Sequence, residues 1–460
     1  MTKPNLTIPL KRGQQLELTV ETLGASGDGI CRHEGYALFA PDTLPGDRIL
    51  AEVIKLTTNW GSVRTLKRIS DSPDRIEPDC PVFPECGGCQ LQDLSYEKQL
   101  QFKMETLTET LKRIGKVEDL PPVASMESER AFRYRNKGIF PIQFRQGKLC
   151  VGFYRRGSHK VVDSPVCNVM LDSINDLKEA LRELFEKHDI SVYNEKKNKG
   201  FLRHLVIRRS EARNETLLGF VTTPGEFRQG FLNEILKKSW LDRFRIKGVV
   251  QNINESSGNV IFGAQNRCLW GSEFLLDEHD GISFQIGLDS FFQVNSRQAE
   301  RLYALIESWV TPGDGLILDA FSGVGSIALR LARSGRRVKG IESFAGAVEN
   351  ARESARLNGL DCEFIHAEVE SHFQTLIDSE SVQTLVLDPP RKGCDPQFIE
   401  AVQKIAPEQI IYISCNPSTL ARDINLLQDY QIKKAVLTDM FPQTRHIESA
   451  LLLERRGDVD

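Results

Sequence analysis

Long hydrophobic runs are missing from this 460-residue sequence. Its first segment, MTKPNLTIPLKRGQQ, has no apolar core of the kind that secretion signals contain, and no run of about 18 or more apolar residues occurs anywhere. We therefore expect a cytoplasmic protein with neither a signal peptide nor a membrane span. Because that compartment is reducing, the ten cysteines should serve as metal ligands or catalytic thiols rather than form disulfides.

An excess of positive charge is also missing. The chain has 59 Lys and Arg against 63 Asp and Glu, a net charge of −4. Such a chain does not bind nucleic acid over its whole surface, so any RNA-binding surface must be a local patch. Three segments mix basic and aromatic residues in a way that can neutralise phosphates and stack unpaired bases: Ala131–Lys137, Phe153–Lys160 and Lys196–Arg209. The alternative is that these segments are only solvated charged surfaces.

Internal repeats and low-complexity tracts are absent, and a chain of this length should form several domains. Residues 8–68 contain short alternating apolar runs between glycine turns, which predict an OB-like barrel of five strands. Residues 69–284 start with a proline-rich loop and predict a central α+β domain with helices at 94–114 and 173–187. The first of these helices can pack on the domain that follows, which we place at residues 285–460.

The last domain alternates strands with helices, a pattern typical of a parallel, doubly wound α/β sheet of Rossmann type. The predicted elements include helices at 296–309, 326–333 and 345–358 and strands at 316–320 and 337–341.

A cofactor site is predicted where the first of these strands ends. Gly323 and Gly325 lie in the turn after the strand, where glycine lets a ligand approach the backbone, and Glu342 can bind ribose hydroxyls. Together with Ala328 the turn also fits a dinucleotide fingerprint. The segment LDPPRKG, with Asp388, resembles the acidic-Pro-Pro turn of S-adenosylmethionine-dependent methyltransferases that act on bases. We therefore favour S-adenosylmethionine as the cofactor.

A cysteine and a carboxylate suggest the reaction. Cys415 in SCNPSTLARD lies between a predicted strand and a helix start, whose dipole should favour the thiolate, and Glu448 precedes the last apolar run. A thiolate that adds to carbon 6 of uracil makes carbon 5 nucleophilic enough to take a methyl group, and a base then removes the carbon-5 proton. Cys394 is the rival nucleophile, but it lies in a loop without a helix start.

The motifs FFQVN, LDAFSGVGS, LDPPRKG, SCNPSTLARD and HIES occur in the order found in the RNA uracil-5-methyltransferase family, the RumA/TrmA group. The sequence resembles this family over nearly its whole length. The resemblance implies that Cys415 is the nucleophile and Glu448 the base. It also implies a set of cofactor contacts: Gln293, Phe321, Glu342, Asp388 and, more weakly, Glu368. The sequence has Ser326 where the related branch often has Asn, so no role is assigned to it.

Four further cysteines form a candidate metal site: Cys80, Cys86, Cys89 and Cys167. Their spacing is compatible with an iron–sulfur cluster, with zinc or with no metal. The pattern is similar to the 4Fe–4S site of the rRNA-modifying branch of the family, and that resemblance implies a 4Fe–4S cluster in the central domain. The segments Gly27–Ile30 and Leu44–Ile49 resemble a TRAM domain, which implies that the barrel binds RNA.

We therefore predict a monomeric enzyme that methylates carbon 5 of a uridine in RNA, with 23S rRNA as its substrate, through a covalent cysteine–uracil adduct. The target base must leave its stack to reach the thiol. One alternative is a tRNA uracil-5-methyltransferase. An alternative of another class is an iron–sulfur oxidoreductase that binds a dinucleotide at the glycine turn, but it leaves Cys415 and Glu448 without roles.

Overall fold

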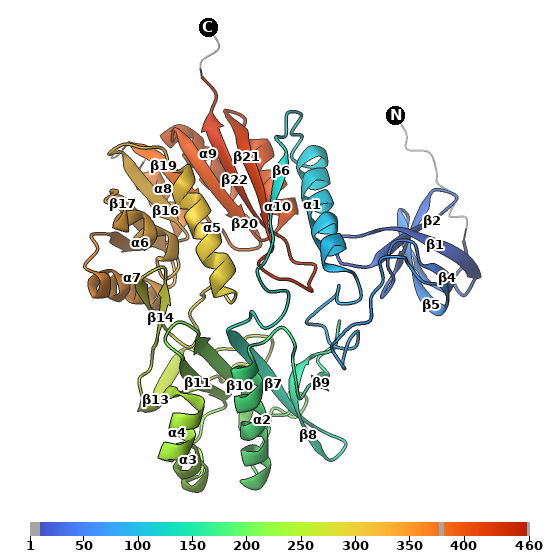
Figure 1. Cartoon of the computed structure of the whole chain (residues 1–460), viewed down its shortest axis with the longest axis vertical. Helices are drawn as coiled ribbons and strands as arrows, with labels where there is room; N and C mark the ends of the chain where they lie inside the picture. The colour runs from blue at the N-terminus through green and yellow to red at the C-terminus, as the bar shows by residue number, and fades with distance from the viewer. Residues whose placement is uncertain (1–9, 377–380, 458–460) are drawn as a thin grey trace.

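The computed structural model describes residues 10–376 and 381–457, so residues 8 and 9 of the predicted barrel lie outside the described residues. A small barrel, a seven-stranded central sheet and an eight-stranded C-terminal sheet make up most of the molecule (Figure 1). The barrel projects from one side of the other two parts. In the described ranges, no helix is both long and apolar enough to cross a membrane.

The N-terminal barrel closes in the order β1-β2-β3-β5-β4, which confirms the predicted five-stranded fold. Its strands are β1 (Gln15–Leu23), β2 (Gly29–His33), β3 (Tyr36–Ala40), β4 (Arg48–Leu56) and β5 (Trp60–Ser70). Buried and more exposed residues alternate along β3 because successive side chains of a strand point to opposite faces. A Cβ added at Gly29 would lie 2.1 Å from Thr43 Oγ1, so glycine is required where β2 begins.

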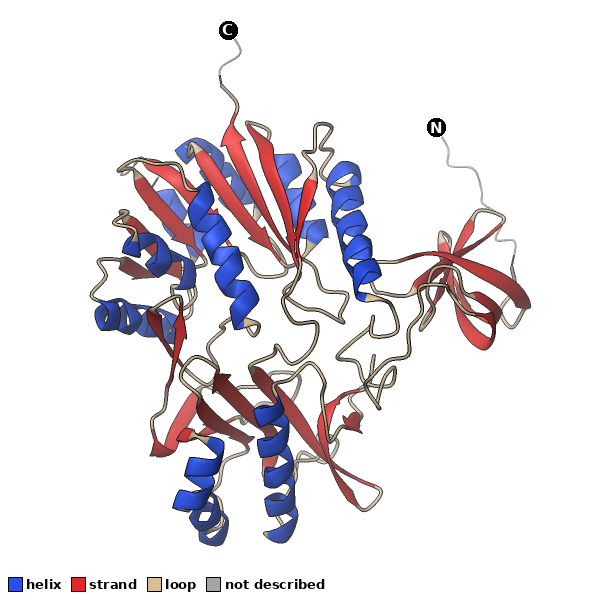
Figure 2. Cartoon of the chain, viewed as in Figure 1, coloured by secondary structure: helices blue, strands red, loops and turns tan. Residues whose placement is uncertain are grey.

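The central sheet has the order β13-β12-β11-β10-β7-β8-β9, and helices cover one of its faces. Figure 2 shows these helices at the end of the molecule farthest from the C-terminal sheet. The strands are β7 (Lys137–Arg145), β8 (Lys148–Tyr154), β9 (Val161–Asp163), β10 (Leu202–Ser210), β11 (Glu215–Thr222), β12 (Ile246–Ile253) and β13 (Gln265–Gly271). The helices are α2 (Asp172–Lys187), α3 (Gln229–Ile235) and α4 (Lys238–Phe244). The opposite face contacts the hairpin β14 (Leu275–His279)–β15 (Ile282–Ile286).

The C-terminal sheet has the order β18-β17-β16-β19-β20-β22-β21-β6. Its strands are β6 (Val123–Met126), β16 (Leu316–Ala320), β17 (Val338–Glu342), β18 (Glu363–His366), β19 (Val382–Leu387), β20 (Gln409–Ser414), β21 (Tyr430–Thr438) and β22 (Glu448–Arg455). Its helices are α5 (Ser296–Trp309), α6 (Ser326–Arg333), α7 (Ala345–Asn358), α8 (Val369–Leu376), α9 (Pro396–Ile405) and α10 (Pro417–Leu426). Two apolar cores, one on each face, confirm a doubly wound α/β domain.

Two elements that precede the central sheet in the sequence belong to this C-terminal sheet in space. Strand β6 pairs in parallel with β21 at the edge of the sheet, and helix α1 (Tyr96–Arg113) packs on α10. Lys103 of α1 and Asp439 are both fully buried, and the Nζ of Lys103 donates to Asp439 Oδ1 at 2.7 Å. The chain thus enters the C-terminal sheet before it forms the central sheet.

The chain order reverses between β16 and β19. Strands β17 and β18 extend the sheet on one side of β16, and β19 and β20 extend it on the other. In open α/β sheets the loops diverge at such a point and leave a crevice at the carboxyl ends of the strands. The residues predicted for the site, from Phe321 to Cys415, lie at these strand ends.

Candidate active site

Strand pairing brings the predicted nucleophile and base together. Strands β20 and β22 are antiparallel, with Ser414 opposite Ser449. Cys415 directly follows Ser414 and Glu448 directly precedes Ser449, so the two residues lie at the same end of this strand pair, where the charge of Glu448 acts on Cys415. Glu448 is buried and Cys415 is half-buried, so the thiol is accessible while the carboxyl is shielded from water.

The charges around the pair shift both titrations. Burial, and then the charge of Asp388, raise the pKa of the Glu448 carboxyl well above its usual range, whereas Arg391 lowers it. Burial raises the pKa of Asp388 to about 6. The pKa of the Cys415 thiol is raised to about 11, first by burial and then by the charges of Glu448 and Asp388. This direction is opposite to the predicted stabilisation of the thiolate by the helix start, so the resting residue is a thiol at neutral pH.

Arg391, which the sequence analysis missed, lies beside the pair. Its charge lowers the pKa of Cys415 and of Glu448. Its backbone carbonyl accepts a hydrogen bond from Asn416 Nδ2 at 3.0 Å, and its Nη2 lies 3.2 Å from His446 Nδ1. The sequence signal was the motif LDPPRKG itself, in which a cation follows the acidic residue by three positions.

A pocket of about 200 Å³ gives access to Cys415. Arg391, Arg445 and His446 line it from the catalytic loops. Ala25 of the barrel and Thr106 of α1 line the other side, and Arg445 Nη1 donates to Ala25 O at 3.0 Å. The entrance therefore lies between three parts of the molecule that are far apart in the sequence.

Cys394 is placed differently from Cys415. It is buried, its amide donates to Asp423 Oδ2 at 2.8 Å, and its sulfur lies 3.4 Å from the hydroxyl of Tyr412. Burial raises the pKa of its thiol to about 12. The site is a packed hydrogen-bond network under α10, which supports a structural role for this rival cysteine.

The backbone around the crevice has features that are typical of a ligand-binding site. Phe321, directly after β16, has a φ of +67°, a conformation that is costly for an aromatic residue and often marks a functional site. The amide of Gly323 donates to Glu342 Oε2 at 3.0 Å, and the amide of Phe344 donates to Glu342 Oε1 at 2.7 Å. Glu342 is thus fixed at the end of β17, beside the glycine turn.

The other predicted cofactor residues border the same crevice or its approach. Asp388 follows β19, and Gln293 precedes α5 in a buried turn. In the described part of the chain, the Oε1 atom of Gln293 is buried without a hydrogen-bond partner, which suits contact with a donor from a ligand. Glu368 lies just before α8, and Ser326 is the first residue of α6.

The four cysteines of the candidate metal site line one pocket of about 380 Å³. Burial raises the pKa of Cys86 to about 11 and that of Cys89 to about 12, and the neighbouring thiols contribute to both shifts. Cys167 comes from the segment before α2, where Asn175 Oδ1 accepts from its amide at 3.0 Å. Across the described ranges, no group of three or more His, Cys, Asp or Glu side chains is arranged to hold a single metal ion.

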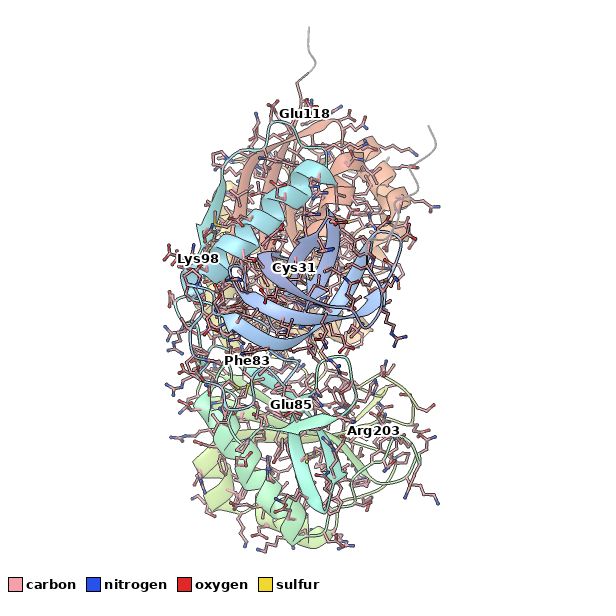
Figure 3. All side chains as sticks on the ribbon, turned by 90° about the vertical axis from the view of Figure 1, so that its right-hand side faces the viewer. Cys31, Phe83, Glu85, Lys98, Glu118 and Arg203 are labelled. Atoms are coloured by element: carbon pink, nitrogen blue, oxygen red, sulfur yellow. The ribbon has the colours of Figure 1, made fainter. Side chains whose placement is uncertain are left out.

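The cysteine loop, residues 71–95, connects the central domain to the catalytic loops. The amide of Gly87 donates to Tyr154 O at 2.9 Å, and a Cβ at this glycine would lie equally close to that oxygen. The amides of Gln90 and Leu91 both donate to Gln443 O at 3.1 Å, five residues before Glu448. Figure 3 shows Phe83 and Glu85 of the loop between the barrel and the central domain. The same pocket also includes Gln293, Arg391 and the strongly exposed Phe291.

The chain is similar to known proteins over nearly its whole length. The family described as tRNA (Uracil-5-)-methyltransferase matches residues 272–456, and the TRAM domain matches residues 9–61. A Listeria monocytogenes protein named as an uncharacterized RNA methyltransferase is 39% identical over 450 residues, 96% of this chain and 98% of its own length. A protein of the same description from Halalkalibacterium halodurans is 37% identical over 459 residues, 98% of this chain and 99% of its own length.

Among solved structures, the tRNA (uracil-54, C5)-methyltransferase of Pyrococcus abyssi, in complex with S-adenosyl-L-homocysteine, has a TM-score of 0.78 and 31% identity. The match covers 95% of this chain and 100% of that one. The fold and the site thus define an S-adenosylmethionine-dependent RNA methyltransferase with a TRAM domain. The chain belongs to the RNA uracil-5-methyltransferase family. This membership leaves no basis for the dinucleotide-dependent oxidoreductase alternative.

Proposed function

We propose that the protein methylates carbon 5 of a uridine in RNA through a covalent adduct between Cys415 and carbon 6 of the base. The observation that carries the proposal is the register of β20 and β22, which puts a thiol and a buried carboxyl at the same end of this strand pair, beside the crevice. Thiol and carboxyl are the two groups that this chemistry needs. The positive charge of Arg391 would favour the Cys415 thiolate when the target uracil enters the site.

The Cys415 thiol first loses its proton to solvent. The thiolate adds to carbon 6, and the electrons of the double bond become available at carbon 5. Carbon 5 takes the methyl group of S-adenosylmethionine, and S-adenosylhomocysteine leaves. Glu448 then removes the remaining carbon-5 proton, the double bond re-forms, and the thiolate leaves. The raised pKa of Glu448 makes its carboxylate a stronger base for this step.

For the cofactor we propose contacts with Gln293, Phe321, Glu342 and Asp388. Glu342 is fixed by two backbone amides at the end of β17, where a carboxylate can bind ribose hydroxyls. The unpartnered Oε1 of Gln293 supports a contact with a cofactor donor. Glu368 is a weaker candidate for the adenine region, and no role is proposed for Ser326.

The cysteine site is proposed to hold a 4Fe–4S cluster. Four thiols around one pocket are the donor set of such a cluster. When bound, the cluster would cross-link the 71–95 loop to the segment before α2. Cys80, Cys86, Cys89 and Cys167 would hold it.

As substrate we propose 23S rRNA, on the resemblance of the cysteine site to the rRNA-modifying branch. The similarity to the Pyrococcus abyssi tRNA enzyme favours tRNA as a second candidate. Purified protein should be incubated with labelled S-adenosylmethionine and either 23S rRNA or tRNA from a strain lacking the gene. Formation of 5-methyluridine in rRNA only would support the first substrate, formation in tRNA only would support the second, and formation in neither would contradict the function.

A further inference from the structure

A second large pocket lies on the central domain and shares no residue with the active-site pockets. It has a volume of about 530 Å³, which is within the range of small-molecule sites. Its walls come from β7, β8, β10 and the 190–200 segment. Two of the basic-aromatic segments singled out in the sequence, Phe153–Lys160 and Lys196–Arg209, meet here. Figure 3 shows Arg203, one of its lining residues, below the barrel in that view.

Aromatic rings form the walls of this pocket. Phe144 on β7 is 66% exposed and lines the pocket. The Tyr193 ring is covered by the Arg203 guanidinium, 4.4 Å from its centroid. The Tyr154 ring packs against His159, with centroids 5.6 Å apart. Flat, partly exposed rings are the surfaces on which nucleic-acid bases stack.

The floor of the pocket includes an unused polar group. His204 is only 8% exposed, and its Nδ1 finds no hydrogen-bond partner among residues 10–376 and 381–457. Burial and Arg203 lower the pKa of His204 to about 4, so the ring is neutral and offers one donor and one acceptor. A neutral donor and acceptor at the end of an aromatic slot match the edge of a base.

Charged groups of both signs line the pocket. Glu195 and His159 are exposed and lie 3.2 Å apart at the rim, whereas Arg203 is buried against the Tyr193 ring. The exposed cations Arg145, Lys160 and Lys196 also line the pocket and can contact RNA phosphates. A base beside the rings would therefore have cations within reach of its backbone.

We propose that this pocket binds one unpaired base of the substrate RNA, distinct from the target uridine, and so anchors the RNA on the central domain. The inference rests on the proposed function, because it assumes that RNA is the substrate. It gives the two basic-aromatic segments a common role. It also gives a role to the partly exposed rings of the central domain.

The test uses whichever RNA, 23S rRNA fragment or tRNA transcript, the wild-type protein methylates. Phe144→Ala removes an exposed ring without disturbing the core, and Lys148→Ala is the control because Lys148 is exposed on the adjoining β8 but outside the pocket. We expect Phe144→Ala to weaken RNA binding roughly 5- to 100-fold, the effect of losing one stacked base. His204→Gln should weaken binding in the same direction. S-adenosylmethionine affinity should be unchanged in all three variants.

A set of RNAs with a single abasic residue at each unpaired position identifies the bound base. One position other than the target should weaken binding to the wild type but not to Phe144→Ala, because the contact is already lost. Equal binding of all these RNAs to Phe144→Ala and wild type would overturn the pocket assignment. Wild-type protein that methylates no uridine would instead contradict the proposed function, so the two failures are distinguishable.

Discussion

At the scale of single residues, the resting thiol of Cys415 is a weak nucleophile. Its pKa is raised to about 11 because it is partly buried and faces the carboxyls of Glu448 and Asp388. Those carboxyls have raised pKa values themselves, and protonation of either removes part of the opposing charge. The charge of Arg391 instead lowers the pKa of Cys415. Formation of the Cys415 thiolate therefore depends on the protonation of Glu448 and Asp388 and on the arrival of the target uracil.

The first prediction concerns the nucleophile. Cys415→Ala should abolish methyl transfer while S-adenosylmethionine still binds, because the thiol makes carbon 5 reactive but need not hold the cofactor. RNA containing 5-fluorouridine should trap the wild type as an adduct, since fluorine does not leave as a proton does. Peptide mapping by mass spectrometry should locate the adduct on Cys415. Cys394→Ala is the control and should still form it; an adduct on Cys394 in the wild type would refute the assignment.

The second prediction concerns the base. Glu448→Gln keeps the shape of the side chain but removes its basicity, so addition and methyl transfer should proceed while proton removal stops. A methylated protein–RNA adduct should accumulate and survive denaturing electrophoresis. Turnover by this variant at a rate close to that of the wild type would show that another group is the base.

The third prediction concerns pH. Because the pKa of Cys415 is raised to about 11, its thiolate fraction should increase about tenfold per pH unit between pH 7 and 9. Alkylation of Cys415 by iodoacetamide, measured peptide by peptide, should follow this slope. Arg391→Gln should slow alkylation at pH 8, since the cation that lowers the pKa is lost. The exposed Cys268 provides the internal control, and equal rates for Cys415 in both proteins would show that Arg391 has no such role.

At the scale of elements, much of the C-terminal domain could be predicted. Helices α5, α6 and α7 and strand β16 have the predicted bounds, because their apolar period and their end residues, such as Asn295 before α5 and Gly359 after α7, are local signals. The meeting of Cys415 with Glu448 depends on the pairing of β20 with β22, which is a long-range contact. Motif order indicated that both residues were functional, but no local signal gave their register. Arg391 had a local signal in LDPPRKG, but nothing in the sequence showed that it lies beside Cys415 and Glu448.

The fourth prediction concerns the contact of α1 with the catalytic loop. Lys103 Nζ donates to Asp439 Oδ1 and to Phe441 O at 3.0 Å, and Tyr96 donates to Asp439 Oδ2 at 2.9 Å. Lys103→Met would leave the Asp439 carboxylate buried and unpaired, which should cost about 3–5 kcal/mol in the free energy of unfolding measured in urea. Methylation should also fall, because this loop leads to Glu448.

The matched control is Lys98→Met on the same helix. Lys98, labelled in Figure 3, is partly exposed and lies 3.7 Å from Asp74, so its loss should change stability by less than about 1 kcal/mol. Replacing both partners, Lys103→Met with Asp439→Leu, should recover part of the lost stability because no unpaired charge remains. Equal effects of the Lys98 and Lys103 substitutions would contradict the assigned importance of the buried pair.

At the scale of the whole molecule, the observed contacts cross the three domain boundaries that the sequence predicts. Segment 96–126 lies within the predicted central domain but packs with the C-terminal sheet, because β6 extends that sheet beyond β21. A four-residue edge strand has no sequence pattern of its own strong enough to predict its partner. The boundaries at 68/69 and 284/285, and the monomeric state, stay predictions. The cysteine loop is in contact with both larger domains, so a change in this loop can reach the catalytic loops.

The last prediction concerns the contribution of the cysteine loop to catalysis. Protein purified without oxygen should contain about four irons per chain, and changing any of Cys80, Cys86, Cys89 or Cys167 to Ser should reduce the iron content, because hydroxyl is a poor ligand for iron. Cys268→Ser, an exposed control, should keep it. RNA methylation should fall more than S-adenosylmethionine affinity, because the loop contacts Gln443 near the base rather than the glycine turn. Colourless protein containing zinc would refute the cluster, and parallel losses of methylation and cofactor affinity would show that the loop supports the whole catalytic domain.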